Sequence, residues 1–242
     1  MKLISLNLWG GRIYEPLVDF LKEQSDVDIF CFQEIYNNSP SKMADQEREP
    51  RLNLFVELKN LLPDYHAFFR PVIKDIYGIG IFVKKKILVL EEGDIFIHSN
   101  PHFSGFGGNH SRNLQWIKLN VGGKMYSVLN VHGLWNGRGK TDTEERIAQS
   151  QRIKEFMSTV GNPKILCGDF NLLPETKSMK MIEEGMINLV KKYDVKSTRS
   201  HFYPKEEKFA DYVLVSPDVN IKDFKVLQEP VSDHLPLVVE FD

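Results

Sequence analysis

Five apolar segments of the chain end in, or lead into, polar residues that suit chemistry better than a hydrophobic core. They are Leu6-Asn7-Leu8-Trp9, Phe32-Gln33-Glu34, Val131-His132-Gly133, Gly168-Asp169-Phe170-Asn171 and Ser232-Asp233-His234. A carboxylate at the end of a buried strand is costly unless a partner or a metal compensates for its lost hydration. Taken alone, each of these residues has an ordinary structural explanation, such as a cap or a core histidine. Their recurrence at strand ends predicts a convergent site.

The motif Gly168-Asp169-Phe170-Asn171 combines a carboxylate and an amide. In an extended strand, Asp169 and Asn171 point to one face and Phe170 points to the other. The carboxylate accepts protons and the amide both donates and accepts hydrogen bonds, so the pair could hold a water or an oxyanion. The same spacing also fits an Asx-turn that closes a strand.

The motif Ser232-Asp233-His234 brings a histidine, the side chain that titrates near neutrality. A carboxylate behind an imidazole can fix its tautomer and orientation. Asp233 precedes His234 directly, so in an extended strand their side chains face opposite ways. We therefore expect the orienting carboxylate to come from another strand, and Asp211, which opens an apolar segment, is the best candidate. A structural anchor at the start of that strand is the alternative.

The polar set is rich in hard oxygen ligands, which are the carboxylates of Glu34, Asp169 and Asp233 and the amide oxygen of Asn7. It contains no clustered thiolates. Oxygen ligands select Mg²⁺, Mn²⁺ or Ca²⁺, whereas zinc sites favour His and Cys. Mg²⁺ is commonly held by carboxylates together with a substrate phosphate, so the pattern indicates hydrolysis of a phosphate ester.

Short strands and helical periods alternate along the chain that must position these residues. We expect strands over residues 2–8, 27–33, 66–70, 78–84, 87–97, 113–121, 124–132, 164–169, 211–216, 220–227 and 235–241. We expect helices over residues 15–24, 54–62 and 178–184, and from a capping box at 141–144 to about residue 160. The pair Gly122-Gly123 between two strands is a hairpin signal, which argues against a doubly wound parallel sheet. The pattern predicts two packed sheets with helices outside, in one domain over residues 1–242.

The composition excludes several classes of protein. The 242 residues include 31 Lys and Arg and 33 Asp and Glu, a net charge of −2, with 42% hydrophobic and 26% charged residues. These fractions argue against disorder, collagen-like repeats and coiled coils. A near-zero charge argues against a protein that coats nucleic acid by bulk electrostatics. It is compatible with an enzyme that grips a few phosphates locally.

The two cysteines, Cys31 and Cys167, lie in apolar, strand-like segments and are expected to be small buried side chains. Without a disulfide framework, the sequence fits a reducing compartment, and we expect a cytoplasmic location. The N-terminal segment lacks the apolar stretch of a signal peptide. No uninterrupted apolar run approaches the ~20 residues that a membrane span needs.

Taken in order, the motifs resemble those of the endonuclease/exonuclease/phosphatase superfamily, also called DNase I-like. The matched order is an Asn-bearing first strand, Gln-Glu, a strand-end His, Gly-Asp-x-Asn, an Asp-Tyr strand and Ser-Asp-His, over residues 5–237. The resemblance implies a four-layered α/β sandwich of two mixed, mainly antiparallel β-sheets flanked by helices. It also implies a metal-dependent phosphoric ester hydrolase that uses Mg²⁺, with Mn²⁺ as a substitute.

The resemblance assigns a role to each site residue. Glu34 would be the principal metal ligand, with Asn7 beside it and Asp233 in the same metal site. The site would lie on one edge of the sandwich. An in-line displacement needs a Lewis acid, a positioned water and cations around the developing negative charge, so these roles agree with the chemistry.

The remaining roles that the resemblance implies are catalytic. Asp169 would activate or orient the attacking water, assisted by Asn171. His234, oriented by Asp211, would contact the scissile phosphate, and His132 would stabilise charge on the phosphoryl oxygens. Mechanisms in the superfamily differ in whether the aspartate or the histidine is the general base, so both Asp169 and His234 are candidates.

Two loops are candidates for substrate recognition, because loops set specificity in folds of this type. The loop before Arg112 contains glycines and the aromatic residues Phe103 and Phe106, and Arg112 could bind a phosphate. A plain flexible loop is the alternative. After His132, Trp135 and Arg138 resemble a platform for base stacking and phosphate binding, unless Trp135 packs on the following helix.

The segment Asn130-Val131-His132-Gly133 resembles the histidine-bearing branch of the superfamily. That branch spans DNase I, tyrosyl-DNA phosphodiesterase, inositol-phosphate phosphatases and sphingomyelinases, so abasic-site repair is disfavoured. Our leading hypothesis is a nuclease that acts on DNA or RNA as a monomer, without an obligate protein partner. The alternatives are a hydrolase of a small-molecule or lipid phosphate ester or of a tyrosyl-DNA type adduct, and a catalytically silent binding module.

Overall fold

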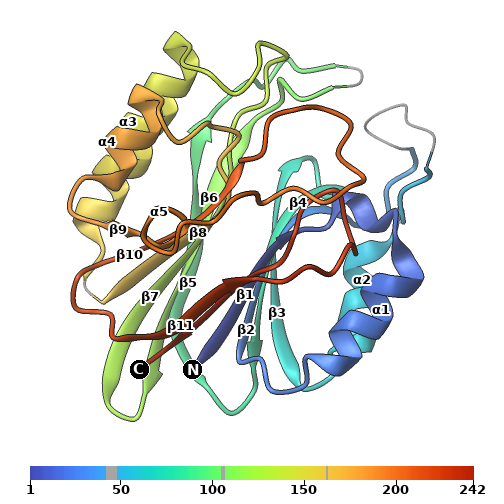
Figure 1. Ribbon diagram of the computed structural model, residues 1–242. Coiled ribbons are helices and arrows are strands. Elements are labelled where there is room, and N and C mark those ends of the chain that lie inside the picture. The colour runs from blue at the N-terminus through green and yellow to red at the C-terminus, as the bar shows by residue number, and fades with distance from the viewer. Residues whose placement is uncertain (42–47, 105–106, 162) are drawn as a thin grey trace.

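The computed structural model describes residues 1–41, 48–104, 107–161 and 163–242, and shows two six-stranded β-sheets packed face to face with helices outside them (Figure 1). The first sheet has the order β11 (Ile221–Val226), β12 (Leu237–Phe241), β1 (Lys2–Asn7), β2 (Ile29–Tyr36), β4 (Tyr77–Lys84) and β3 (Tyr65–Ile73). The second has the order β5 (Leu88–His98), β6 (Arg112–Val121), β7 (Lys124–His132), β8 (Lys164–Asp169), β10 (Asp211–Val215) and β9 (Ile187–Asn188).

Helices cover the outer face of each sheet, which completes four layers (Figure 1). The helices α1 (Tyr14–Glu23) and α2 (Leu54–Leu61) lie beside the first sheet, and α3 (Glu144–Thr159) and α4 (Lys177–Glu183) lie beside the second. A short 3₁₀ helix, η1 (Trp9–Gly11), follows β1, and α5 (Leu189–Lys192) follows β9. The expected fold class, two mixed sheets flanked by helices, is confirmed. No helix of the described residues is long and apolar enough to cross a bilayer.

Each sheet is antiparallel except for one central parallel pair, which is β1–β2 in the first sheet and β7–β8 in the second. Parallel neighbours need a crossover connection, and a helix provides it in both cases: α1 joins β1 to β2, and α3 joins β7 to β8. The partners at the carboxyl ends are Asn7 with Gln33 and His132 with Asp169. The topology therefore brings four strand ends with polar residues to one edge of the sandwich.

Hydrophobic packing fills the space on both faces of β2, which explains its nearly continuous apolar sequence. Cys31 faces the other sheet and packs in the same cluster as Cys167 of β8, and both thiols are free and buried. Phe30 and Phe32 face outward and pack with the apolar side chains of α1 and α2. Near the polar edge, Gln33 Nε2 donates to Asn130 Oδ1 at 2.7 Å, which ties the two sheets together.

Most element boundaries lie within a few residues of those expected from the sequence. Three short elements were not predicted, namely η1, β9 and α5, which have 3, 2 and 4 residues. Elements of this length show no hydrophobic period, so the pattern cannot reveal them. The strand expected over residues 27–33 continues to Tyr36, past a register shift between Phe32 and Ile35.

Gly168 is required at the close approach of β7 and β8. Its φ is +136°, and a Cβ atom there would lie 2.0 Å from the carbonyl oxygen of Val131. We expect Gly168→Ala to lower the free energy of unfolding by about 2–4 kcal/mol, because strain and a backbone clash add together. Urea unfolding checks this value. Gly161→Ala is the control, since a Cβ at Gly161 meets open space; equal stability of the two variants would contradict the prediction.

Candidate active site

Asn7 joins the ends of the two parallel pairs. Its Nδ2 donates to Glu34 Oε1 and to Asp169 Oδ2, both at 3.0 Å, and its Oδ1 accepts from the backbone N–H of Trp9 at 2.9 Å. The amide nitrogen, and not the oxygen that was predicted to bind a metal, therefore faces the two carboxylates. Asn7 is fully buried, so it fixes one carboxylate from each sheet relative to the other.

Glu34 lies at an irregular point of β2, where the pairing with β4 shifts register. Its φ is +58°, a conformation that costs free energy for a residue with a Cβ atom and that recurs at functional sites. Its side chain keeps 24% exposure and lines a pocket, while burial raises the pKa of its carboxyl group. His132 lies between the carboxylates, with Nε2 3.8 Å from Glu34 Oε1 and 3.8 Å from Asp169 Oδ2.

Asp169 and Asn171 both line the same pocket, but not as alternate residues of a strand. The strand β8 ends at Asp169, and Asn171 has a φ of +53°. The backbone N–H of Asn171 donates to Asp169 Oδ1 at 2.9 Å, and its Nδ2 donates to the carbonyl of Gly133 at 3.1 Å. An Asx-type turn thus brings both side chains to one side, and Phe170 packs in the core behind them.

Asp211 and His234 form a buried hydrogen-bonded pair, with 2.7 Å between Asp211 Oδ1 and His234 Nδ1. The other oxygen of Asp211 accepts from Thr198 Oγ1 at 2.8 Å. Asp211 opens β10 and is the register partner of Asp169 on β8, which explains why the pair stands beside Asp169. His234 Nε2 lies 3.6 Å from Asp169 Oδ2.

Asp233 and His234 face the same site, so the expectation that they point to opposite faces is wrong. Residues 232–234 do not form an extended strand; the backbone N–H of His234 instead bonds to Ser232 Oγ at 3.2 Å. Asp233 Oδ1 lies 3.8 Å from His234 Nε2, and Asp233 lines the pocket. The alternation rule fails because it holds only for extended backbone.

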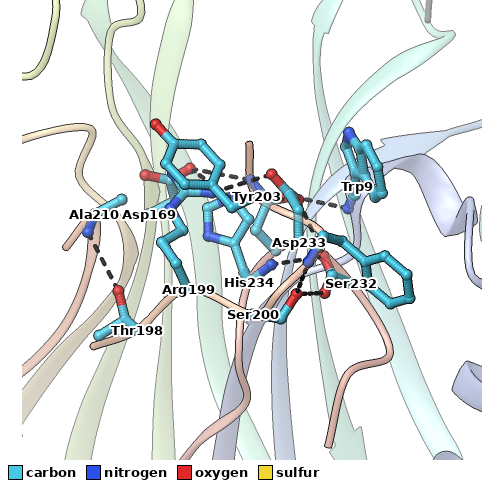
Figure 2. Close-up of polar contacts among 12 residues, drawn as sticks. Trp9, Asp169, Thr198, Arg199, Ser200, Tyr203, Ala210, Ser232, Asp233 and His234 are labelled. Atoms are coloured by element: carbon cyan, nitrogen blue, oxygen red, sulfur yellow. Dashed lines mark hydrogen bonds and ion pairs between the residues drawn. The ribbon is translucent and has the colours of Figure 1, made fainter. Parts of the chain in front are cut away.

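Arg199, whose side chain is only 6% exposed, is a site residue that the sequence pattern did not reveal. It forms an isolated antiparallel bridge with His234, donates to His234 Nε2 and lies 3.2 Å from Asp233 Oδ2 (Figure 2). Its guanidinium group covers the ring of Tyr203 at 4.1 Å (Figure 2). No apolar strand precedes Arg199 in the sequence, so no strand-end signal marks it.

The charges around His234 set its protonation state. Burial, and then the Arg199 cation, lower the pKa of His234 to about 4, so its ring is neutral at neutral pH. Because Nδ1 faces the Asp211 carboxylate, the proton is assigned to Nδ1 and the lone pair of Nε2 faces Arg199. Burial raises the pKa of Asp211 to about 6, against the opposing effect of Arg199.

The site opens into a pocket of about 800 Å³. Arg112, predicted as a loop residue, instead begins β6 and is only 2% exposed at the pocket wall. Its Nη2 donates to the carbonyl of Gly108 at 3.0 Å, while Nε and Nη1 have no partner among the described residues. Its cation and burial together lower the pKa of His132 well below its usual range, with burial the larger cause.

The predicted recognition residues after His132 divide into two groups. Trp135 lines the pocket, and Lys205 lies over its ring at 4.8 Å. Arg138 is exposed and is not among the lining residues, whereas Lys140 of the same loop is. The loop turns at Gly137 and Gly139, on either side of Arg138, both with positive φ, which the sequence pattern did not resolve. Phe106 of the other predicted loop lies outside the described residues.

The sequence matches a family model described as "Endonuclease/Exonuclease/phosphatase family" over residues 4–234. No curated protein matches the sequence. Among solved structures, an endonuclease/exonuclease/phosphatase from Bacteroides vulgatus has 19% identity and a TM-score of 0.73, over 100% of this chain and 98% of that one.

Two further solved structures resemble the chain over its whole length. A mannosyl-6-phosphatase of Bacteroides thetaiotaomicron has 21% identity and a TM-score of 0.76, over 100% of this chain and 99% of that one. A humanized D. rerio TDP2 has 18% identity and a TM-score of 0.76, over 100% of this chain and 98% of that one. Identities this low show a shared fold and carry no substrate with them.

Proposed function

Because the chain belongs to the endonuclease/exonuclease/phosphatase family, whose members hydrolyse phosphoric esters, we propose that it is a divalent-metal-dependent phosphodiesterase that acts on DNA or RNA. The observation that carries the proposal is that three polar residues from both sheets meet at the pocket. His132 Nε2 lies 3.8 Å from Glu34 Oε1 and 3.8 Å from Asp169 Oδ2. The pocket walls combine aromatic and basic side chains, the types that stack on bases and bind phosphates. These are Trp9, Trp135, Phe202, Arg12, Arg48 and Lys205.

The donor set at the pocket fits a divalent cation. Glu34 offers a partly exposed carboxylate, and Asp233 offers a second one in the same pocket. Such oxygens suit Mg²⁺, with Mn²⁺ as a substitute, and a bound cation would supply positive charge to the phosphoryl oxygens. Asp169, Asp211 and His234 also lie within 4.8 Å of one another. That trio fits a metal less well, because both oxygens of Asp211 already accept hydrogen bonds.

The contacts of Asp169 favour it as the general base. Its oxygens are held by the N–H of Asn171 and by Asn7 Nδ2, which fixes the carboxylate toward the pocket. His234 is the weaker candidate, because Arg199 donates to its Nε2. We assign Asp169 to orient and deprotonate the attacking water, and His234 with Arg199 to contact the scissile phosphate.

Stabilisation of charge on the phosphoryl oxygens was predicted for His132 alone, and we assign it to His132 and Arg112 together. The lowered pKa of His132 leaves its ring neutral at neutral pH, so it offers a hydrogen bond and not a charge. The positive charge next to it belongs to Arg112, whose Nε and Nη1 have no described partner. We assign Arg112 to bind a phosphoryl oxygen, which would satisfy a buried cation that is otherwise costly.

Cleavage of labelled oligonucleotides tests the proposal. The protein is incubated with single- and double-stranded DNA and RNA, in Mg²⁺ and in EDTA. We expect metal-dependent cleavage, with single strands favoured, because a pocket of about 800 Å³ admits a nucleotide-sized group more readily than a duplex flank. Absence of metal-dependent cleavage of every nucleic acid would refute the nuclease function.

Hydrolysis of a small phosphate ester is the second candidate, and the size of the pocket favours it. Its volume of about 800 Å³ falls within the range of small-ligand sites, roughly 300–1,000 Å³. A panel of sugar phosphates, inositol phosphates and a 5′-phosphotyrosyl oligonucleotide distinguishes the candidates. Turnover above that on plain oligonucleotides would identify the better substrate class. A cytoplasmic location is part of the proposal, supported by the free thiols of Cys31 and Cys167.

Replacement of Asp211 by asparagine is expected to reduce kcat roughly 10²-fold, because a neutral amide no longer holds the Nδ1 proton of His234 with a charged acceptor. The pKa of Asp211 is about 6, so the wild-type rate should fall as the pH drops through this value and the carboxylate takes up a proton. The pH–rate profiles of both proteins check this. A wild-type rate and an unchanged acid limb in Asp211→Asn would show that the pair does not contribute.

A further inference from the structure

Lys140 is a buried cation in the pocket wall, and no carboxylate of the described residues is its partner. It is only 2% exposed, and among the described residues no carboxylate forms an ion pair with it. Its Nζ donates to Tyr203 Oη at 2.6 Å and lies 4.4 Å from the centre of the Tyr203 ring. A buried ammonium group is costly unless it is paired, and a neutral phenol compensates for little of its lost hydration.

The fold holds this lysine firmly in place. Its carbonyl accepts from the backbone N–H of Leu173 at 2.9 Å. Arg146 of α3 is fully buried and holds the loop on both sides of Lys140. It donates to the carbonyls of Leu134, Gly139 and Thr141, at 3.1, 2.6 and 2.7 Å. A cation that is fixed in advance binds an anion at a smaller entropic cost than a mobile one.

Tyr203 reaches the pocket from a different loop, and its ring is covered by Arg199. Its hydroxyl accepts from Lys140 and lies 3.5 Å from Glu207 Oε2, beyond the length of a strong hydrogen bond. Burial lowers the pKa of Lys140 to about 8, so the ammonium form still dominates at neutral pH. The pair therefore presents a charged donor and a hydroxyl donor side by side at the wall.

We propose that Lys140 and Tyr203 form a second anion subsite, which binds a phosphate group of the substrate other than the scissile one. The inference rests on the proposed function. Arg112 already offers two unpartnered nitrogens beside His132 for the scissile phosphate, which leaves Lys140 as a further cation of the same pocket. In a nucleic acid, the second phosphate is either a terminal monoester or the next diester. Both supply the tetrahedral oxyanion that an ammonium and a hydroxyl bind.

Three thymidine substrates test the subsite and separate the two sources. They are a dinucleotide with one phosphodiester, the same dinucleotide with a 5′-phosphate, and a trinucleotide. We expect the wild-type protein to prefer at least one substrate with a second phosphate by about tenfold in kcat/KM, the effect of one charged hydrogen bond. Preference for the phosphorylated dinucleotide identifies the monoester, and preference for the trinucleotide identifies the diester. An equal rate on all three would overturn the proposal.

The variants separate charge from structure. Lys140→Met should abolish the preference, Lys140→Arg should retain most of it, and Tyr203→Phe should retain part of it, since the ring is kept. Lys180→Met, which removes an exposed cation of α4, is the matched control. A preference that survives in Lys140→Met, or one that is lost equally in Lys140→Arg, would also overturn the proposal.

A binding measurement without turnover tests the subsite independently of the proposed function. Calorimetry in EDTA compares thymidine 3′,5′-bisphosphate with thymidine 5′-monophosphate on the wild-type protein and on Lys140→Met. We expect tighter binding of the bisphosphate by the wild-type protein only. If that difference appears while no nucleic acid is cleaved, the nuclease function fails and the subsite stands. If nucleic acid is cleaved and the difference is absent, the subsite fails.

Discussion

Asp169→Asn is expected to reduce kcat by roughly 10³-fold, with a small change in KM, because it removes the proposed general base and keeps the shape of the side chain. In the wild-type protein, one oxygen of Asp169 accepts from the N–H of Asn171 and the other accepts from Asn7 Nδ2. An asparagine there must place its own NH₂ group against one of these donors. The carboxylate that faces His132 and His234 is lost at the same time.

Steady-state hydrolysis of a single-stranded oligonucleotide measures this loss. The NH₂ group of the variant faces another hydrogen-bond donor, which lowers the stability of the protein. Its urea unfolding is therefore measured in parallel, and the rate is compared only under conditions in which the protein is folded. Asp223→Asn on β11, far along the first sheet, is the control and should keep the wild-type rate. If folded Asp169→Asn keeps more than about a tenth of the activity, Asp169 is not the general base, and His234 takes its place as the candidate.

The strand ends were predictable from the sequence because burial makes a polar residue at the end of an apolar run conspicuous. Asn7, Glu34, His132 and Asp169 all follow such runs, and the parallel pairs β1–β2 and β7–β8 bring them to one edge. The contact between Asp211 and His234 was anticipated for a similar reason. An isolated carboxylate at the start of an apolar strand needs a polar partner, because burial of an unpaired charge is costly.

The remainder of the site depends on backbone conformations that hydrophobic periodicity does not encode. Glu34 and Asn171 adopt positive φ values, and residues 232–234 leave the extended conformation, so alternation gives the wrong direction for Asp233. Arg199 and Lys140 lie in loops, and only tertiary contacts bury them. Their sequence neighbours are polar, so nothing local distinguishes these cations from exposed ones.

The overall charge of −2 does not describe the charge at the wall of the pocket. Several cations with buried side chains lie at or beside the site. They include Arg112, Lys140 and Arg199, and of these three only Arg199 is paired with a carboxylate among the described residues. A protein with no bulk excess of positive charge can therefore still present cations where a phosphate enters. This local arrangement favours recognition of a few phosphates over coating of a long polyanion.

Glu34→Gln is expected to weaken the binding of the divalent cation and to lower kcat/KM at least about 10²-fold at a fixed Mg²⁺ concentration, because it replaces the proposed principal ligand by a neutral one. Glutamine keeps the length of the side chain and one oxygen. It loses the charge that attracts the cation, and its NH₂ group then competes with Asn7 Nδ2, which donates to Glu34 Oε1 at 3.0 Å.

Two measurements separate metal binding from other effects of this variant. Activity is titrated with Mg²⁺ and with Mn²⁺, and binding of Mn²⁺ alone is followed by electron paramagnetic resonance. We expect the variant to need a higher concentration of either metal and to recover part of its activity when that concentration is raised. Glu57→Gln on α2 is the control and should behave like the wild-type protein. Glu57 lies away from the site and pairs with Arg51, with 2.9 Å between Glu57 Oε1 and Arg51 Nη2.

If Glu34→Gln loses activity while its affinity for Mn²⁺ is unchanged, Glu34 acts on the substrate or the water, and the metal is bound by other residues. Asp233 is then the ligand to replace next. Among the described residues it is the other carboxylate that lines the pocket and lies outside the trio of Asp169, Asp211 and His234.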